Sequence, residues 1–193
     1  MAEGTLFYVI GASGSGKDSL LRYGRERLAG DPGVVFAHRY ITRPVELHGE
    51  NHVALGETEF DARLKAGLFA MHWDSHGLRY GIGREINLWL AKGCNVVMNG
   101  SREYLPQARR RYPALNAVMV AVSPEVLAAR LRARGRETEA EIAGRLERAS
   151  RFMRPDGQVE LIDNDGELHQ AGKRFVQLLA GNRAGREAGL RCG

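Results

Sequence analysis

The sequence predicts an α/β fold, a three-layer sandwich in which helices cover both faces of a central parallel sheet. Short apolar runs alternate with helical patterns along the 193 residues, and the first run enters a helix through a glycine-rich turn. Uninterrupted apolar runs are typical of parallel strands, which are buried on both faces. At 44% hydrophobic residues the chain can bury one core, so we expect a single domain over residues 1–180. The expected strands are residues 7–10, 34–37, 95–98, 117–122 and 159–162.

Helical patterns fill the intervals between these strands. Pro124 stands at a favoured first helical position, and Thr138-Glu-Ala-Glu141 is a capping box. Thr58 is expected to cap one helix and Gly67 to end it. The expected helices are residues 18–29, 58–67, 84–91, 101–111, 124–135, 167–179 and one that begins at 138. Residues 181–193 have no apolar face, so we expect a disordered tail there.

Residues 38–83 interrupt the alternation of strand and helix. Their first part, residues 38–56, has three histidines and little apolar periodicity, which indicates a loop-rich binding segment outside the core. The two apolar runs on either side of Asp74-Ser-His-Gly77 indicate a hairpin. The sequence therefore predicts a small α+β lobe, residues 38–83, inserted into a core of residues 4–37 and 84–180.

The glycine-rich turn has the spacing of a phosphate-binding loop. It matches G-x-x-x-x-G-K-[ST] except that Asp18 replaces the hydroxyl residue that normally holds magnesium. Inward-pointing backbone N–H groups and the positive end of the following helix dipole bind phosphate in such turns. A turn that binds nothing is the alternative, but strand, turn, lysine and helix arrive in the required order. We expect ATP to bind here with Mg²⁺ on Asp18; the expected contacts are Gly11, Ala12, Ser13, Gly14, Ser15, Gly16, Lys17, Asp18 and Ser19.

Charge and composition limit the classes of partner. The net charge of +5 fits nucleic acid, a membrane surface or small phosphorylated molecules. The arginines of residues 130–154 lack the interleaved aromatic residues that stack on bases, and no apolar run approaches the ~18 residues of a membrane span. Cys94 and Cys192 show neither metal spacing nor a disulfide framework. We expect a cytoplasmic protein that binds small phosphorylated molecules; the sequence leaves its oligomeric state open, a homodimer included.

Over about residues 4–180 the chain resembles the guanylate-kinase-like branch of the P-loop kinases. The shared residues are Gly11 to Lys17, Thr42-Arg43-Pro44 with Gly49-Glu50, Gly67-Leu-Phe69, His76-Gly77 with Tyr80-Gly81, and Arg130-Leu-Arg-Ala-Arg134-Gly-Arg136 with Arg145-Leu146. The resemblance implies that the inserted lobe binds the phosphate acceptor and that residues 130–150 form a lid over ATP. It also implies that Arg43 and Tyr80 hold the acceptor's phosphate and that Asn164 lies beside adenine. The lid residues implied to approach the transferring phosphoryl group are Arg130, Arg134 and Arg145.

The chain departs from guanylate kinases where they recognise guanine. Met71 and Ile82 replace a glutamate and a hydroxyl residue, and Asn99 replaces an aspartate at the end of a strand. In this combination the chain is similar to the ribose 1,5-bisphosphate phosphokinases of bacterial phosphonate breakdown. That similarity implies transfer of the ATP γ-phosphate to the 1-phosphate of ribose 1,5-bisphosphate, giving ADP and 5-phospho-α-D-ribose 1-diphosphate. The segments that carry it are Gly16-Lys-Asp-Ser19, Gly49-Glu-Asn-His52, Trp73 with His76-Gly-Leu78 and Tyr80-Gly81, and Asn99-Gly-Ser101.

The lobe holds enough polar side chains for a sugar with two phosphates. The expected donors to phosphate, with the matched residue His76, are Arg43, His52, Arg79, Tyr80 and Arg84; the expected acceptors from ribose hydroxyls are Glu50, Asn51 and Asp74. Two alternatives remain open at this stage, a guanylate or other nucleoside monophosphate kinase and a non-catalytic guanylate-kinase-like binding module. The retained Lys17 and lid arginines favour an active enzyme.

Overall fold

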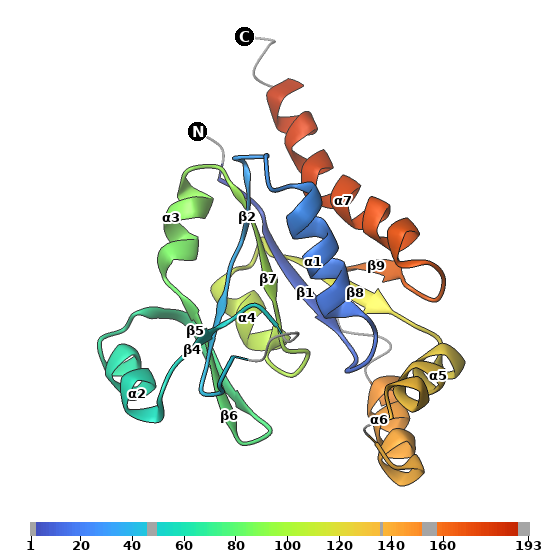
Figure 1. Ribbon diagram of the computed structural model, residues 1–193. Helices are drawn as coiled ribbons and strands as arrows, with labels where there is room; N and C mark the ends of the chain where they lie inside the picture. The colour runs from blue at the N-terminus through green and yellow to red at the C-terminus, as the bar shows by residue number, and fades with distance from the viewer. Residues whose placement is uncertain (1–2, 46–49, 136, 152–157, 189–193) are drawn as a thin grey trace.

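The main sheet of the computed structural model has five parallel strands in the order β2-β7-β1-β8-β9 (Figure 1). The structure describes residues 3–45, 50–135, 137–151 and 158–188. Each strand lies on an apolar run of the sequence, as expected for a sheet buried on both faces. The strands are β1 Leu6–Gly11, β2 Val34–Phe36, β7 Asn95–Asn99, β8 Asn116–Ala121 and β9 Val159–Asp163.

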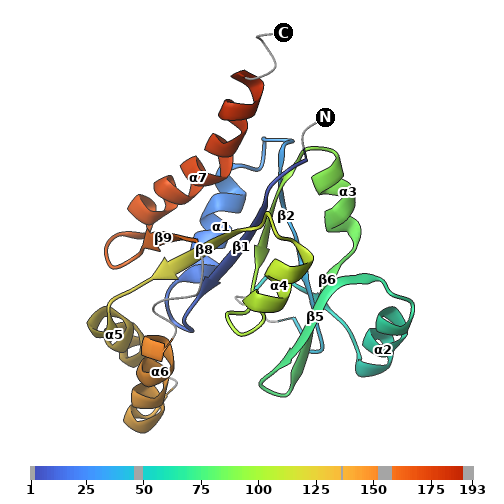
Figure 2. The same ribbon diagram turned by 180° about the vertical axis from the view of Figure 1, so that it is seen from behind.

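Helices cover both faces of this sheet, which confirms the three-layer α/β fold (Figures 1 and 2). The side chains of β1 alternate between the two faces. Tyr8 packs in a cluster that includes Leu105 of α4 (Leu105–Arg111) and Ile86 of α3 (Glu85–Ala91). Val9 packs in a second cluster with Leu20 of α1 (Lys17–Arg27) and Phe175 of α7 (Leu168–Ala188). The phosphate-binding turn therefore follows directly on a buried strand, and the packing of that strand fixes the position of the turn.

A second sheet is built from the residues between β2 and α3. Its order is β4-β3-β6-β5, and β5 and β6 form the expected hairpin. The turn of that hairpin has positive φ at His76 (51°) and Gly77 (72°), as in the tight turns that match strand twist. The elements are β3 Arg39–Ile41, β4 Val53–Ala54, α2 Glu57–Lys65, β5 Phe69–Ser75 and β6 Leu78–Gly83.

Two expectations for this region were wrong. Residues 38–56 are not wholly a loop outside the core, because β3 pairs with β6 and Ile41 is fully buried. That pairing joins residues far apart in the sequence, so no periodicity within residues 38–56 predicts it. The cap of α2 is Gly56 and not Thr58, and the helix begins at Glu57 without a side-chain cap.

The remaining helices begin and end close to where the sequence signals predicted, except that α4 begins later and the C-terminal helix ends later. In the capping box, Thr138 N donates to Glu141 Oε2 at 2.8 Å and Glu141 N to Thr138 Oγ1 at 3.3 Å. This box opens α6 (Glu139–Arg151), which follows α5 (Pro124–Arg134). The α4 helix begins later than expected, because Tyr8 Oη bonds the backbone of Ser101 and holds a turn there.

The C-terminal helix is longer than the sequence suggested. It runs to Ala188, so the segment from 181 to 188 is helical and not a disordered tail. Alanine, arginine and glutamate in this stretch are good helix formers and extend the helix without an apolar face. The expectations for Cys192 fall outside the described residues.

Candidate active site

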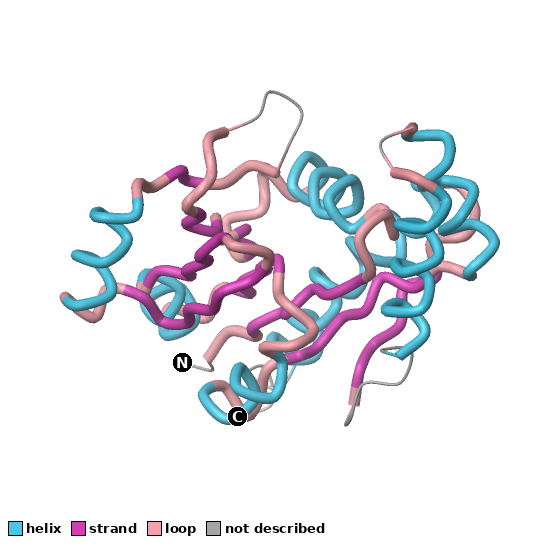
Figure 3. Tube along the Cα trace, turned by 90° about the horizontal axis from the view of Figure 1, so that it is seen from below, coloured by secondary structure: helices cyan, strands magenta, loops and turns pink. Residues whose placement is uncertain are grey.

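The candidate site is a cleft of about 850 Å³ at the carboxyl ends of the parallel strands, where α/β sheets bind ligands. Figure 3 views this end of the molecule, with the small sheet on one side and α5 and α6 on the other. The cleft brings together the phosphate-binding turn, three lid arginines and part of the lobe. Its lining comprises Gly11, Ala12, Ser13, Gly14, Gly16, Lys17, Asp18, Ser19, Arg39, Arg43, Trp73, Ser75, His76, Leu78, Tyr80, Gly100, Ser101, Arg102, Glu103, Arg130, Leu131, Arg134, Arg145 and Arg148.

The backbone of the turn is held from behind. Gly14 and Gly16 have φ of 93° and 84°, a conformation that side chains with a Cβ rarely adopt. Asn164 Nδ2 donates to Ser15 O at 2.7 Å, and a Cβ on Gly16 would lie 2.5 Å from the same nitrogen. Asn164 is thus buried against the turn and does not line the cleft. Its position adds a role that the sequence did not suggest, which is to fix the cradle's shape.

Ser15 is buried directly beneath this backbone. Its hydroxyl oxygen and Asn164 Oδ1 have no hydrogen-bond partner, although both atoms are buried. An unpaired buried polar atom is costly, and such atoms in a native fold call for a specific reason. Their place under a glycine-rich turn fits a cradle shaped to bind a ligand on its other side.

Lys17, Asp18 and Asn99 form a hydrogen-bonded triangle at the start of α1. Lys17 Nζ donates to Asn99 Oδ1 and, at 3.2 Å, to Asp18 Oδ1, which also accepts from Asn99 Nδ2 at 3.2 Å. Burial lowers the pKa of Lys17, and the Asp18 carboxylate partly opposes that shift. Burial would raise the pKa of Asp18, but the Lys17 charge and the bonds from Lys17 and Asn99 outweigh it and lower that pKa. Asp18 is therefore an ionised carboxylate held against the residue that replaces the strand-end aspartate.

The residues around Asp18 fit a magnesium ion held largely by nucleotide phosphates. Among the described residues, no three His, Cys, Asp or Glu side chains gather into a metal cluster. Mg²⁺ needs only one or two carboxylates when substrate phosphates and waters complete its shell. The Asp18 side chain is 65% exposed and lines the cleft, so it offers one such ligand.

The predicted lid arginines bond to the turn, to Asn164 beneath it, or to the shared carboxylate of Glu137. Arg130 Nη2 donates to Asn164 O at 2.7 Å, and Arg145 Nη1 donates to Ser13 Oγ at 2.6 Å. Arg134 and Arg145 both pair with Glu137, whose side chain is 7% exposed. Helices α5 and α6, which include the expected lid, thus place three guanidinium groups beside the cradle.

On the opposite wall, the small sheet contributes a mixed set of predicted and unpredicted residues. Arg43, His76 and Tyr80 line the cleft as expected. Trp73 lies beside them and stacks on Tyr80, with ring centroids 5.5 Å apart and planes 3° apart. The cleft residues to which sequence reasoning assigned no role include Arg39, Trp73, Arg102, Glu103 and Arg148.

Five other predicted residues lie elsewhere. His52 is buried, and its ring nitrogens contact the carbonyl oxygens of Glu50 and Arg43 at 2.9 and 3.0 Å. Glu50 and Asn51 border a neighbouring cavity of about 370 Å³. Asp74 is 83% exposed, and Arg84 is the exposed first residue before α3; neither lines the cleft.

The register of the hairpin explains why Arg79 also lies outside the cleft. Trp73 pairs with Tyr80 and Asp74 with Arg79, so these pairs point to opposite faces of the sheet. Arg79 lies on the face covered by α2, where it pairs with Asp61 at 2.6 Å. Period-2 alternation along the predicted hairpin could have separated the two faces. Gly49 and Arg136, which belong to the quoted motifs, lie outside the described residues.

Comparisons with known proteins identify the family. No family model matches the chain. It is 78% identical over 188 residues to ribose 1,5-bisphosphate phosphokinase PhnN of Thiobacillus denitrificans, covering 97% of this chain and 99% of that protein. It is 55% identical over 180 residues to the protein of the same name in Chromobacterium violaceum, covering 93% and 96%. The chain belongs to the ribose 1,5-bisphosphate phosphokinase family.

The fold of this family member is also that of other phosphoryl-transfer enzymes. The structure resembles guanylate kinase from Anaplasma phagocytophilum with a TM-score of 0.63 and 16% identity, covering 94% of this chain and 87% of that one. A gluconokinase from Sinorhizobium meliloti gives a TM-score of 0.50 at 20% identity, covering 99% and 98%. The expected guanylate-kinase-like fold is therefore confirmed. No helix in the described part of the chain is long and apolar enough to span a bilayer.

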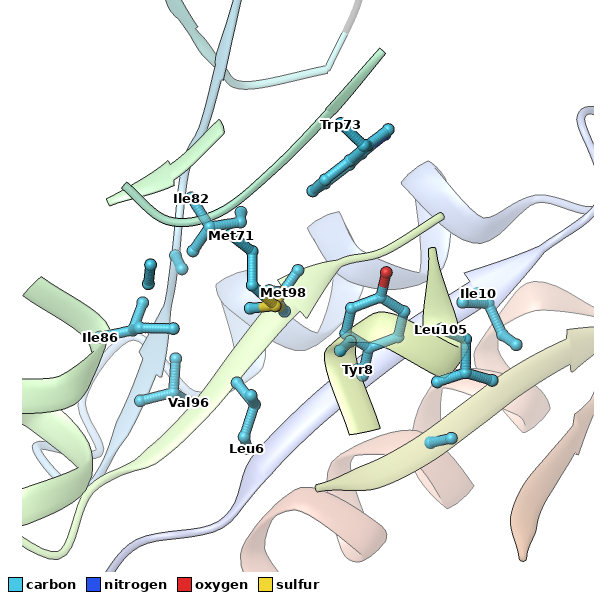
Figure 4. Packing of buried hydrophobic residues seen from close by; sticks show 14 of the residues in the cluster. Leu6, Tyr8, Ile10, Met71, Trp73, Ile82, Ile86, Val96, Met98 and Leu105 are labelled. Atoms are coloured by element: carbon cyan, nitrogen blue, oxygen red, sulfur yellow. The ribbon is translucent and has the colours of Figure 1, made fainter. Parts of the chain in front are cut away.

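In this member of the ribose 1,5-bisphosphate phosphokinase family, the two residues that replace the guanine-recognising residues of guanylate kinases lie in the core. Met71 is 1% exposed and Ile82 is fully buried. Figure 4 shows them packed among Ile86, Met98 and the other side chains of this cluster. Neither lines the cleft, so they do more than lack polar atoms: their side chains fill the space beneath the small sheet.

Proposed function

We propose that the chain transfers the γ-phosphoryl group of ATP to the 1-phosphate of ribose 1,5-bisphosphate. The products are 5-phospho-α-D-ribose 1-diphosphate and ADP. The family to which the chain belongs supports this reaction. The cytoplasmic location that we expect is consistent with ATP and a sugar phosphate as substrates.

One observation of the structure carries the proposal, the charge of the cleft. Its lining holds one lysine and seven arginines against the two carboxylates of Asp18 and Glu103. A triphosphate and a bisphosphate in one cleft need such an excess of cations, since each monoester phosphate brings ≈ 1.5 to 2 negative charges and the triphosphate adds its own. Arginine forks match phosphate oxygens in pairs and orient them as well as neutralise them.

The transfer needs positioning more than proton chemistry. The acceptor is itself a phosphate that is largely ionised at neutral pH, with a second pKa of ≈ 6, so no side chain must remove a proton. We assign to the turn and Lys17 the binding of the donor's phosphates, and to Arg130, Arg134 and Arg145 the charge of the group in transfer. Bound beside Asp18, magnesium would neutralise charge on the same phosphates.

The acceptor would bind on the small sheet. Arg43 and Tyr80 line the cleft across from the lid, so they are suited to hold the reacting phosphate. Among the described residues, Arg43 Nε is buried without a hydrogen-bond partner, which leaves donor capacity on this side chain. The buried Met71 and Ile82 offer no group to a guanine edge, and a site lacking such bonds loses that discrimination.

A product assay with a panel of acceptors tests the proposal. Purified chain, ATP and Mg²⁺ are combined with ribose 1,5-bisphosphate, GMP, AMP or ribose 5-phosphate. A phosphoribosyltransferase that consumes 5-phospho-α-D-ribose 1-diphosphate reports its formation directly. We expect this product from ribose 1,5-bisphosphate and little or no turnover of GMP. Efficient GMP phosphorylation without the diphosphate product would overturn the proposal in favour of a nucleoside monophosphate kinase.

A further inference from the structure

Arg39 is the cleft residue whose side chain is held most firmly on the acceptor wall. It comes from β3, and its Nε donates to Glu50 Oε1 at 2.6 Å while its Nη2 donates to Glu50 Oε2. Both side chains are only 13% exposed. The guanidinium carbon also lies 4.8 Å from the centre of the Tyr80 ring. Carboxylate and ring together fix the plane of the guanidinium group before any ligand binds.

Among the described residues, the Arg39 guanidinium makes its two hydrogen bonds to Glu50. A guanidinium group has five N–H bonds in a fixed fork, and the two bonds to Glu50 occupy one edge of it. Arg39 lines the cleft, so the remaining edge is available to a ligand there. A prearranged fork loses less conformational entropy on binding phosphate than a free arginine does.

The register of the small sheet separates Arg39 from Arg43. Arg39 pairs with Ile82, which belongs to the buried core (Figure 4). Arg43 lies past the end of β3, next to Thr42, whose backbone N donates to Arg79 O at 3.1 Å on the way to the hairpin turn. The chain bends at Thr42 and Arg43, so Arg39 leaves the wall from within β3 and Arg43 from beyond its end.

The lid lies at the hairpin end of this wall. Figure 1 shows the β5–β6 turn and α6 projecting from the same end of the molecule, and His76 of that turn lines the cleft with Arg134. Arg43 lies nearer the hairpin turn than Arg39 does, and so nearer the lid end of this wall. Tyr80, whose ring stacks on Trp73, pairs with Ile41 and so lies between the two arginines along the register of β3.

We propose that Arg39, positioned by Glu50, binds the phosphate of the acceptor that does not react. This inference rests on the proposed function and adds to it the residue that selects a bisphosphate over a monophosphate. Glu50 is then a positioning residue that acts through Arg39. Its two carboxylate oxygens both accept from Arg39, a role different from the ribose contact that the sequence led us to expect.

Two monophosphates test the inference, because each carries one of the two phosphates. Binding of ribose 5-phosphate and of ribose 1-phosphate is measured by calorimetry for the wild-type chain and for Arg39→Met. We expect Arg39→Met to weaken ribose 5-phosphate by roughly 10- to 100-fold, the range for a lost hydrogen bond to a charged group. The affinity for ribose 1-phosphate should change by no more than about twofold. Glu50→Gln, which keeps the shape but loses the charge, should weaken ribose 5-phosphate alone and by less.

Arg79→Met is the matched control. Arg79 stacks on Phe60 at 4.4 Å and pairs with Asp61, but it does so on the opposite face of the same sheet. This variant should bind both monophosphates like wild type. Arg39→Lys, which keeps the charge and loses the fork, serves as a second variant if Arg39→Met fails to fold, with thermal melting as the check. It should show the same selective loss.

The outcomes separate this inference from the proposed function. Equal weakening of both ligands, or weakening of ribose 1-phosphate alone, would overturn the assignment of Arg39. Failure of the wild-type chain to bind ribose 5-phosphate at millimolar concentration would overturn it too. The proposed function fails only if wild-type chain makes no 5-phospho-α-D-ribose 1-diphosphate from ribose 1,5-bisphosphate, whatever the variants bind.

Discussion

The two walls of the cleft are made from different parts of the protein. The donor wall is the glycine-rich turn after β1, which Asn164 holds through Ser15 O and Arg145 contacts through Ser13 Oγ. On the acceptor wall, the small sheet presents side chains: the Arg39–Glu50 pair, Arg43 and the stacked rings. A backbone cradle recognises phosphate whatever carries it, whereas side chains at fixed spacing recognise one molecule. Specificity should therefore depend on the acceptor wall and rate on the donor wall.

The strongest test of this division is Lys17→Met. Lys17 is the cation of the cradle motif, and its loss should lower kcat by about 10³-fold with every acceptor that the enzyme uses. The selectivity among acceptors should not change. Because burial already lowers the pKa of Lys17, removing its charge should cost little stability.

Steady-state kinetics and thermal melting measure the two effects separately. Lys92→Met is the control, since Lys92 lies at the end of α3 and does not line the cleft. A Lys17→Met variant with near-normal kcat would show that the cradle does not bind the transferring phosphates. A change in acceptor preference would show that the two walls are not separate in function.

Arg134→Ala should have the next largest effect. This arginine shares Glu137 with Arg145, and both line the cleft near the turn. We expect kcat to fall by about 10²-fold with a small change in the KM for ATP, because the contact forms mainly in the transition state. Arg132→Ala on the same helix is the control. Its side chain is 56% exposed and pairs with exposed Glu139, and surface pairs contribute ~0 to 1 kcal/mol. A rise in KM for ATP alone would mean that Arg134 binds ground and transition states equally.

The same two walls differ in how far the sequence predicts them. The donor wall follows from local signals: glycine spacing and the order of strand, turn and helix place Lys17 and Asp18 without knowledge of the tertiary fold. The lid arginines come from a motif of similar kind, and the capping box at Thr138 fixes the start of α6. The parallel sheet is equally predictable from the sequence, because each strand is an apolar run.

The acceptor wall depends on pairings between distant residues. Nothing near Arg39 in the sequence distinguishes it from other arginines; Glu50 and Tyr80 give it its place, and β3 itself was not predicted. His52 was expected at the ligand, yet its ring bonds two carbonyl oxygens and holds the loop instead. Asp74 and Arg79 could have been set aside by alternation across the hairpin. The burial of Met71 could not, because it needs the packing of the two sheets.

Of the three substitutions, Asp18→Asn should have the smallest effect on kcat. It tests which part of the donor wall binds magnesium. If Asp18 holds magnesium, the variant should lose roughly tenfold in kcat at low magnesium and recover as magnesium is raised. The alternative is a carboxylate that only complements the helix dipole, worth ~0.3 to 1 kcal/mol, in which case the magnesium dependence would be that of wild type. Glu103→Gln is the matched control, because Glu103 is the other carboxylate that lines the cleft. Kinetics over a range of magnesium concentrations at saturating ATP distinguish the cases. A magnesium dependence that shifts for Glu103→Gln and not for Asp18→Asn would move the proposed metal ligand from the cradle to the loop that follows β7.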